Sequence, residues 1–509
     1  MRFRDDQMVL RMRSHRIILT ACFIVPWIGH LHGQRRNENA LLMGYTQYAG
    51  SKLNFANTTP LDLGEFPFLA WGECSSAISD TSGNFLFGFG TGVVYDHVGG
   101  VIDQSLWYEL NGDVTQGSLI FPRPGTTGVY DLFVIKNAPQ QGSDVFVEAA
   151  CLSVDMALNG GLGGVTASVS FGANYTEKLC GTPHGNGTDY WALTHEWGTN
   201  AFRAYRIDAA GLDTVPMVSL AGSPHTEAYG DCLRTNYQGE MKFSYAGHLI
   251  ALCTQNTPCE EGSWAIQPAI VQLFHFNDLT GDVSYWMDLP DHHMTYGLDF
   301  SQDGSKLYVA GSDTVVHYVD QYDLDAGDTT AIIASRYRVY DSTYTEISSL
   351  RPSAMSFAPD GRLYVSHLGT SLDAILHPDL PGADCGYTVG YFPLANMHYF
   401  ASHCNQLKRY HDSEYKRPGT VGFPSVVQAP GFGAWPNPAA SVLHLGLPNG
   451  IVSPDIHICD ATGRTVHVSG PQAARTGTID VSSLANGLYT VSLLDGSRIL
   501  GATRVVVQR

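Results

Sequence analysis

Three short segments of the chain carry side chains that could bind a metal ion. The first, His195-Glu196, begins like the metal-binding helix of a zinc protease. Thr199 stands where the second imidazole of that motif would be, and Gly198 disfavours a helix, so a face with two imidazoles cannot form. We expect a strand end and a turn there instead.

The second segment, Asp291-His292-His293, offers two imidazoles, which are good ligands for Zn or Cu. Neighbouring residues of a strand point to opposite faces, so His292 and His293 could bind one ion together only from a loop. These two residues are the candidate metal ligands of the chain.

The third segment is rich in carboxylates, the ligands that Ca²⁺ prefers. Its members are Asp320, Asp323, Asp325 and Asp328. They lack the twelve-residue loop ending in Glu, so a solvated hairpin turn is the preferred interpretation. No cofactor is predicted, and calcium is the alternative at this segment. The chain also lacks a G-x-S-x-G elbow, a Walker A loop and a G-x-G-x-x-G after a strand. No catalytic residue is therefore predicted.

Short strands joined by glycine turns would have to position these residues. The three clearest copies of this unit are Met241–Ala251, Phe300–Val309 and Phe357–Val365. Their turn glycines, Gly247, Gly304 and Gly361, lie 57 residues apart each time. Repeats of about 40–50 residues with four strands each are typical of a β-propeller.

The roughly 375 residues of the repeat region, at about fifty per blade, predict seven blades. We expect residues 41–55 to complete one blade together with strands from the far end, because closure protects exposed sheet edges. A stack of β-sandwich modules is the alternative.

The last eighty or so residues alternate between apolar and polar side chains in short runs bounded by turns. The clearest runs are Ser441–Leu445, Ile456–Asp460 and Leu488–Leu494. They predict a small β-sandwich. The fold class is therefore all-β: a seven-bladed β-propeller followed by a small C-terminal β-sandwich.

This tail resembles the type A sorting domain of the type IX secretion system. The matching elements are P-N-P-A at 436–439, D-A-T-G-R at 460–464, I-D-V-S-S-L-A-N-G-L-Y at 479–489 and a closing V-V-V strand. The resemblance implies the type IX secretion machinery as a partner, and a secreted or cell-surface location reached through the periplasm. The residues that carry the sorting motif are Trp435, Pro436, Asn437, Pro438, Gly463, Gly487 and Tyr489.

The N-terminus is consistent with export. A basic start and an apolar run at 17–28, too short for a ~30 Å hydrocarbon core, are typical of a signal peptide at 1–33. A retained anchor is the alternative, although we expect no transmembrane segment in the mature protein. The predicted domains are the propeller at 41–420, a linker at 421–432 and the sorting domain at 433–509.

The composition of the chain limits the classes of molecule that it is expected to bind. The net charge is −19, with 54 Gly and only 15% charged residues. An acidic protein of this kind argues against nucleic acid and anionic membranes. Ten Cys are present, and disulfides between Cys253 and Cys259 and between Cys385 and Cys404 are reasonable in an exported protein.

Residues 41–410 also resemble a family of exported, WD40-like propellers that carry this kind of tail. The matches include E-C-S-S-A-I-S-D at 73–80, L-I-F-P-R-P-G at 119–125, V-D-M-A-L-N-G-G-L-G at 154–163 and D-Y-W-A-L-T-H at 189–195. The family implies no reaction.

Two functions follow from these observations. The favoured one is a non-catalytic binding propeller for an extracellular glycan or protein ligand. The alternative is a metal-dependent propeller hydrolase or lactonase with a metal in the central channel, for which His195, His292 and His293 would be tested first. A ring of polar residues facing the channel would separate the two functions, and the sequence alone does not reveal one.

Overall fold

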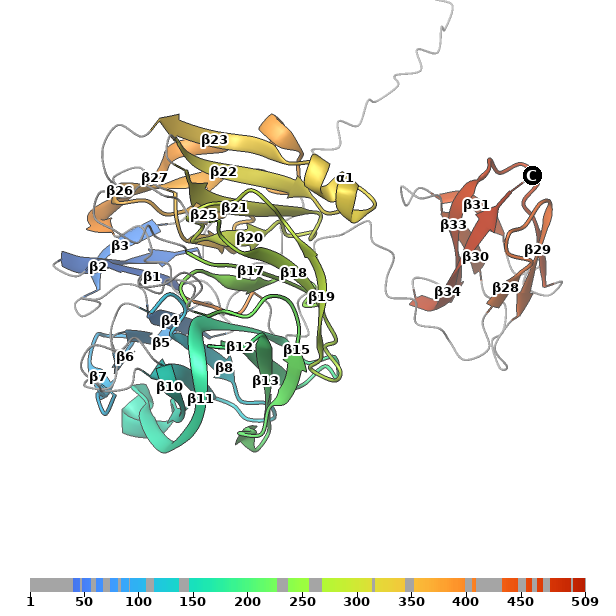
Figure 1. Ribbon diagram of the computed structural model, residues 1–509. Helices are drawn as coiled ribbons and strands as arrows, with labels where there is room; N and C mark the ends of the chain where they lie inside the picture. The colour runs from blue at the N-terminus through green and yellow to red at the C-terminus, as the bar shows by residue number, and fades with distance from the viewer. Residues whose placement is uncertain are drawn as a thin grey trace, which may run out of the picture.

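The computed structural model describes most of the chain between Ala40 and Gln508 (Figure 1). The described residues are 40–45, 48–55, 61–66, 74–80, 84–90, 92–106, 114–136, 146–226, 237–255, 268–313, 316–343, 352–398, 405–408, 433–446, 455–459, 465–469, 477–495 and 498–508. Within these ranges the structure is almost entirely β, and its one α-helix is α1 (Thr329–Ala334). No helix of the described residues is long and apolar enough to cross a membrane.

Four sheets are antiparallel meanders of four strands paired in sequence order. The first is β4 (Ser75–Ser79), β5 (Phe85–Gly90), β6 (Val93–Asp96) and β7 (Val101–Asp103). The second is β16 (Met241–Phe243), β17 (Leu249–Cys253), β18 (Val271–Phe276) and β19 (Val283–Asp288). The third is β20 (Leu298–Phe300), β21 (Lys306–Ser312), β22 (Val316–Asp323) and β23 (Tyr337–Thr343). The fourth is β24 (Met355–Phe357), β25 (Leu363–Val365), β26 (Gly369–Ile375) and β27 (Tyr387–His398).

A larger sheet of eight strands lies between the first and second meanders in the sequence. Its strands are β8 (Ser118–Pro122), β9 (Val129–Lys136), β10 (Phe146–Asp155), β11 (Gly164–Pro183), β12 (Tyr190–Glu196), β13 (Ala201–Asp208), β14 (Gly211–Leu212) and β15 (Met217–Leu220). The first part of β11, up to Tyr175, pairs with β10, whereas Tyr175 and the residues from Leu179 onward pair with β12. The long strand β11 therefore joins β8–β10 to a second half, β12–β15, in which β14 and β15 pair with different parts of β13.

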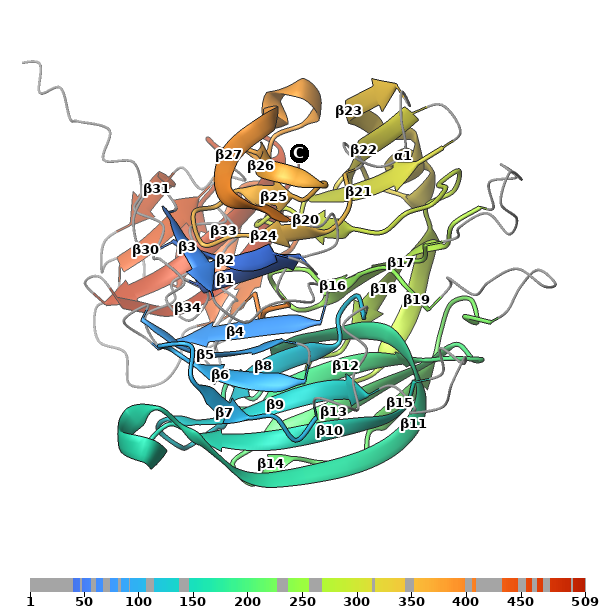
Figure 2. The same ribbon diagram turned by 90° about the vertical axis from the view of Figure 1, so that its left-hand side faces the viewer.

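The sheets follow one another around a common centre, so the fold is propeller-like (Figure 2). Apolar cores fill the spaces between neighbouring sheets. One core joins β12 and β13 to β16–β18, a second joins β17–β19 to β20–β22, and a third joins β21 and β22 to β24–β26. Successive side chains of a strand point to opposite faces of its sheet, and each face packs against a neighbouring sheet. Both sets of side chains are therefore apolar, so these strands are nearly continuous apolar runs in the sequence.

The N-terminal segment differs from the expectation. Strands β1 (Ala40–Tyr45), β2 (Tyr48–Asn54) and β3 (Leu61–Phe66) form a sheet of their own and add no strand to β24–β27. The reason is that β24–β27 already has four strands. Leu53 and Phe55 instead join a core shared with the β4–β7 and β24–β27 sheets. The segment therefore packs between the first and last meanders.

The turns predicted from the evenly spaced glycines are present. Gly247, Gly304 and Gly361 have φ of 80°, 77° and 83°, and each amide donates to the carbonyl three residues earlier. These turns join β16 to β17, β20 to β21 and β24 to β25. A side chain is strained at such φ values, which explains glycine at these positions.

The expected disulfides are not formed. Cys253 and Cys385 are free, buried thiols, and Cys259 and Cys404 lie outside the described residues. The Cys253 Sγ donates to the Tyr296 carbonyl at 3.1 Å, and burial raises its pKa to about 12. This thiol fills the core rather than forming a cross-link.

The C-terminal part has two sheets with a common apolar core. One sheet is β28 (Gly433–Trp435), β29 (Val442–Gly446) and β32 (Thr478–Asp480). The other is, in spatial order, β31 (Thr465–Ser469), β30 (Asp455–Cys459), β33 (Gly487–Asp495) and β34 (Arg498–Val507). The strands predicted at 441–445, 456–460 and 488–494 correspond to β29, β30 and β33.

Candidate functional site

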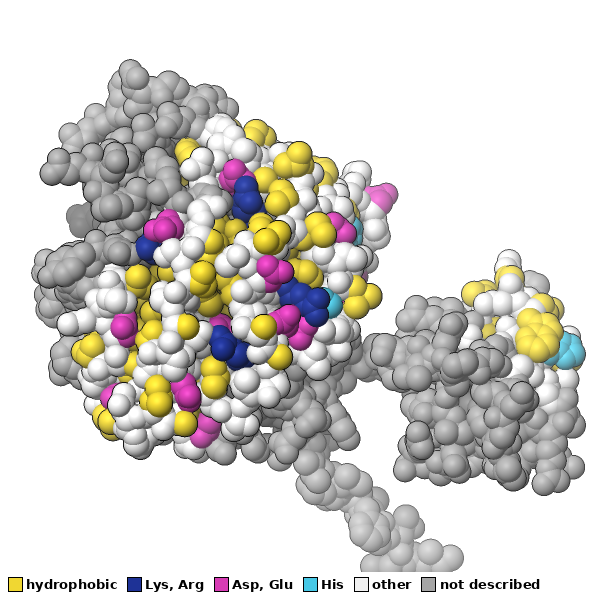
Figure 3. All heavy atoms as spheres, turned by 90° about the horizontal axis from the view of Figure 1, so that it is seen from below, with side chains coloured by type: hydrophobic (Ala, Val, Ile, Leu, Met, Phe, Trp, Pro, Cys, Tyr) yellow, Lys and Arg dark blue, Asp and Glu magenta, His cyan; other side chains and the backbone are white. Residues whose placement is uncertain are grey.

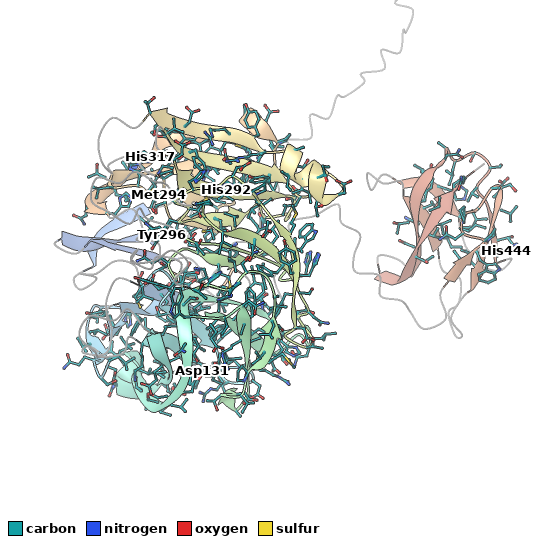
Figure 4. All side chains as sticks on the ribbon, viewed as in Figure 1. Asp131, His292, Met294, Tyr296, His317 and His444 are labelled. Carbon is teal, nitrogen blue, oxygen red and sulfur yellow. The ribbon has the colours of Figure 1, made fainter. Side chains whose placement is uncertain are left out.

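His292 lies in the tight loop between β19 and β20 and points into the protein (Figure 4). It is fully buried, with Nδ1 3.1 Å from the Tyr318 hydroxyl and Nε2 2.8 Å from the Tyr322 hydroxyl. Asp291 and Met294 have φ of 59° and 41°, so the loop turns sharply on both sides of the imidazole. Both ring nitrogens of His292 are thus already hydrogen-bonded.

His293 engages the same tyrosine differently. Its backbone amide donates to the Tyr318 hydroxyl at 3.2 Å, and its carbonyl accepts from that hydroxyl at 3.3 Å.

Burial lowers the pKa of His292 well below its usual range, and the charges of Arg336 and Arg338 add to this effect. Across the described ranges, no group of three or more His, Cys, Asp or Glu side chains is placed to hold a metal ion.

The carboxylates considered for calcium are used separately. Asp320 is fully buried on β22 and accepts from the guanidinium groups of both Arg336 and Arg338. Asp323 accepts from Lys306 Nζ at 3.0 Å, and Asp328 caps the first turn of α1 by accepting from the Ala331 amide. Asp323 and Asp328 thus lie at a hairpin turn followed by a capped helix, whereas the buried Asp320 departs from the solvated turn that the sequence favoured.

His195 lies at the end of β12, as expected, and Gly198 in the following turn has φ of 82°. Its imidazole is 1% exposed and stacks on His225 with ring centroids 3.9 Å apart. Burial lowers the pKa of His195 to about 3, with a further contribution from the positive charge of Lys178. His195 therefore belongs to the core of this sheet.

A cluster of charged side chains lies where the innermost strands approach one another, and we call Glu240, Lys242, Asp299 and Lys408 the axial cluster. They come from β16 or the residue before it, from β20, and from the short described segment after β27. The side chains of Glu240 and Asp299 are 3% and 0% exposed. This buried polar group between the first strands of neighbouring sheets is one that the sequence alone did not reveal.

Glu240 ties three inner strands together. One carboxylate oxygen accepts from the backbone amides of Leu298 on β20 at 3.1 Å and Met355 on β24 at 3.3 Å. The other lies 3.2 Å from Lys242 Nζ. Burial raises the pKa of Glu240 to about 7 even though Lys242 opposes the shift. Burial alone would lower the pKa of Lys242, but Glu240 and Asp299 outweigh it and raise this pKa.

Asp299 has a similar set of partners. It accepts from the amide of Phe300 at 2.7 Å and from the amide of Phe357 on β24 at 3.0 Å, and it is in contact with Lys408 Nζ. Lys408 also donates to the Phe243 carbonyl at 2.8 Å. The side-chain amide of Gln116 also bonds to β16. It donates to the Met241 carbonyl and accepts from the Met241 backbone amide.

The axial cluster is therefore saturated. Each carboxylate has a lysine as its counter-charge and backbone amides from neighbouring strands as donors. Buried charges are tolerated when they are paired and hydrogen-bonded in this way. The cluster can act as an electrostatic tie between strands.

The sorting motif also has a defined place. Trp435, Pro436, Asn437 and Pro438 are exposed, and Trp435 stacks on His444, whose position Figure 4 shows. The Asn437 side-chain oxygen accepts from the Val506 amide at 2.8 Å. The motif therefore holds the final strand, β34.

Three residues of the predicted motif remain. Gly487 begins β33, and Tyr489 on the same strand donates its hydroxyl to the Ala485 carbonyl at 2.9 Å. Gly463 lies outside the described residues. The described part of the motif thus acts in the packing of the sorting domain itself.

Comparison with known protein families confirms the sorting domain that the sequence predicts for the C-terminal part. Residues 433–508 match the family described as the secretion system C-terminal sorting domain. The chain is therefore exported, to the cell surface or the medium, and its partner is the type IX secretion machinery. No curated protein matches the chain.

Solved structures with a similar shape include three propeller or lactonase proteins. A candidate 6-phosphogluconolactonase of Bacteroides fragilis has a TM-score of 0.35 and 10% identity, over 92% of this chain and 98% of its own. The periplasmic gluconolactonase of Pseudomonas aeruginosa has a TM-score of 0.37 and 12% identity, over 92% and 99%. The Dos1 propeller has a TM-score of 0.39 and 8% identity, over 74% and 95%. Scores and identities this low carry no information on activity.

Proposed function

We propose that this protein is an exported, non-catalytic binding propeller. The observation that carries this proposal is the saturation of the axial cluster. A hydrolase that used a metal in the channel would need carboxylates free to bind the ion, whereas Glu240 and Asp299 are committed to Lys242, Lys408 and backbone amides. A WD40-like architecture of seven blades fits the sheets if the eight-stranded sheet counts as two blades and β1–β3 as one.

The proposed domain organisation keeps a signal peptide at 1–33, the propeller at 41–420, a linker at 421–432 and the sorting domain at 433–509, the last as a two-sheet sandwich. The common core of β28–β34 supports the sandwich. Residues 1–33 and 421–432 lie outside the described residues.

The outer strands suggest the kind of ligand. β15 and β19 are in contact, and the Val283 amide of β19 donates to the Ser219 hydroxyl of β15 at 2.9 Å. The large side chains exposed on these strands or on adjoining turns are Val215, Met217, Val218, Leu220, Leu279 and Tyr285. We call this set the lateral surface. Figure 3, which views the molecule from below, shows hydrophobic side chains interspersed with acidic and basic ones over the described part of that face.

The lateral surface favours a protein ligand over a glycan. Sugars stack on exposed aromatic rings, whereas five of these six side chains are aliphatic. Trp191 is 6% exposed, and Trp197 and Trp286 are partly buried against apolar cores. Exposed aliphatic groups close together on a monomer surface are typical of a protein–protein contact.

Site-specific cross-linking on the intact producing cell tests the proposal. A photo-reactive side chain would replace Leu220, which is 74% exposed, and a matched control would replace Val98, which is 69% exposed in the β6–β7 turn. We expect a defined adduct with one protein from position 220 and none from position 98. Equal labelling from both positions, or adducts with glycans alone, would contradict a protein ligand at the lateral surface.

A further inference from the structure

The described segment after β27, Asn405–Lys408, lies among the innermost strands. Asn405 forms a parallel bridge with Ser76 of β4, and its amide donates to the Ser75 carbonyl at 2.8 Å. The segment therefore adds to the inner edge of the first meander as one more short extended piece. This is the way in which extended peptides bind to sheet edges in many recognition proteins.

The side chains of this segment reach further sheets. The Asn405 amide group donates to the carbonyls of Ser118 on β8 at 3.0 Å and Leu179 on β11 at 2.8 Å. Leu407 is fully buried in the core that contains Phe121 and Leu179. A Cβ added at Gly181 would lie 2.6 Å from the Leu407 side chain, so this glycine makes room for it.

Lys408 completes the series. Its ammonium donates to the Phe243 carbonyl of β16 and to the Asp299 carboxylate of β20. Four consecutive residues thus contact β4, β8, β11, β16 and β20, strands that belong to separate sheets or sheet halves. Each side chain meets a partner of matching chemistry. The Asn405 amide group donates to two carbonyls, Leu407 packs in an apolar core beside Gly181, and the Lys408 ammonium pairs with a carboxylate.

We propose that the centre of this propeller is a binding site for an extended peptide, filled in cis by Asn405–Lys408. The occupant reads as Asn, Gln, Leu and Lys, and it ties the early sheets to the later ones. Asn405–Lys408 follows the last of the four meanders in the sequence. The ring of sheets is therefore fully joined only after this segment has been added at the centre. This inference does not depend on the ligand of the lateral surface.

The test vacates the site in the full chain and refills it in trans. Residues 405–408 would be replaced together by Gly-Ser-Gly-Ser, which keeps the chain length but removes all four side chains. A capped synthetic peptide of residues 403–410 is then titrated while the melting temperature is measured. We expect the vacated variant to melt several degrees lower, and the peptide to restore the loss in a saturable way.

Matched controls define the specificity. A peptide with Lys408→Met should bind at least tenfold more weakly than the unchanged peptide, because Lys408 donates to the Phe243 carbonyl and to the Asp299 carboxylate. Wild-type protein should not respond to any peptide, because its site is filled. A folded vacated variant that ignores the peptide, or a wild type that responds equally, would overturn the proposal.

A second measurement covers the case in which the vacated variant does not fold. Hydrogen exchange on the wild-type full chain reports the amide of Asn405, which is bonded to Ser75. We expect the peptide fragment with residues 405–408 to exchange as slowly as β4 and β8. Exchange within seconds, as in a free loop, would show that the segment does not occupy the centre.

Discussion

Removing the His195 imidazole should make the propeller less sensitive to acid. In the folded protein burial holds the pKa of His195 at about 3, against the ordinary value of 6.5. The unfolded chain therefore takes up a proton below pH 6.5 that the folded protein does not. The stability contributed by the neutral imidazole is complete above pH 6.5 and is lost progressively as the pH falls toward 3.

The magnitude follows from the two pKa values. Each pH unit below 6.5 costs about 1.4 kcal/mol for one such group, so the change from pH 7.5 to pH 5.0 costs about 2 kcal/mol for His195. Other groups act in the opposite direction, since burial raises the pKa of Glu240 to about 7. For this reason the total pH dependence of the wild type is not informative, and the comparison must be made between variants.

The assay is urea unfolding of the full chain at pH 7.5 and 5.0, for the wild type and for His195→Phe. Phenylalanine keeps a ring against His225 and Phe202 but cannot be protonated. His195 Nδ1 has no hydrogen-bond partner, so little is lost there at neutral pH. We expect the variant to lose about 2 kcal/mol less than the wild type between the two pH values.

A solvent-exposed imidazole provides the control. His97 is exposed in the β6–β7 turn, and His97→Phe is measured in parallel as the same substitution outside the core. If His195→Phe lost as much stability as the wild type on acidification, the argument that burial keeps this imidazole neutral would be refuted.

Three further predictions concern the turns, the axis and the tail. Gly304→Val should lower stability by about 2 kcal/mol because a β-branched residue is strained at φ of 77°, whereas Gly304→Asn should cost less; equal melting temperatures for all three proteins would count against this. Lys408→Met should cost about 3–5 kcal/mol because it leaves the buried Asp299 without its counter-charge, and adding Asp299→Asn should recover part of the loss in denaturant titrations. Deleting residues 430–509 should trap the protein in the periplasm, and normal surface display of the truncated protein in cell fractionation would contradict the role of the tail.

The parts of the fold that local chemistry determines could be predicted from the sequence. A turn that requires positive φ selects glycine, so Gly247, Gly304 and Gly361 mark three hairpins directly. The alternating runs of the tail identified β29, β30 and β33 in the same way. Local sequence did not settle how the N-terminal strands pair, because an apolar strand pattern does not say which strand is its partner; the structure places β1–β3 in a sheet of their own.

The centre of the fold could not be predicted, for a physical reason. Asp299 and Lys408 are 109 residues apart, and nothing in the intervening sequence indicates that they meet. Lys242 and Asp299 do occupy the same position relative to the turn glycines Gly247 and Gly304, which is a signal that could have placed both on inner strands. His292, a candidate metal ligand in the sequence, is instead hydrogen-bonded through both ring nitrogens to two tyrosines of β22, which the local sequence does not indicate.

The most direct test of the proposed non-catalytic role is a turnover assay on the purified full chain with a panel of lactones and esters, with and without added Ca²⁺, Mn²⁺ or Zn²⁺. Asp299→Asn, which changes one axial carboxylate, serves as the comparison. We predict no turnover by the wild type above that of the variant under any metal condition. Metal-dependent turnover that is abolished by a chelator and by Asp299→Asn would contradict the account and establish an enzyme at the axis.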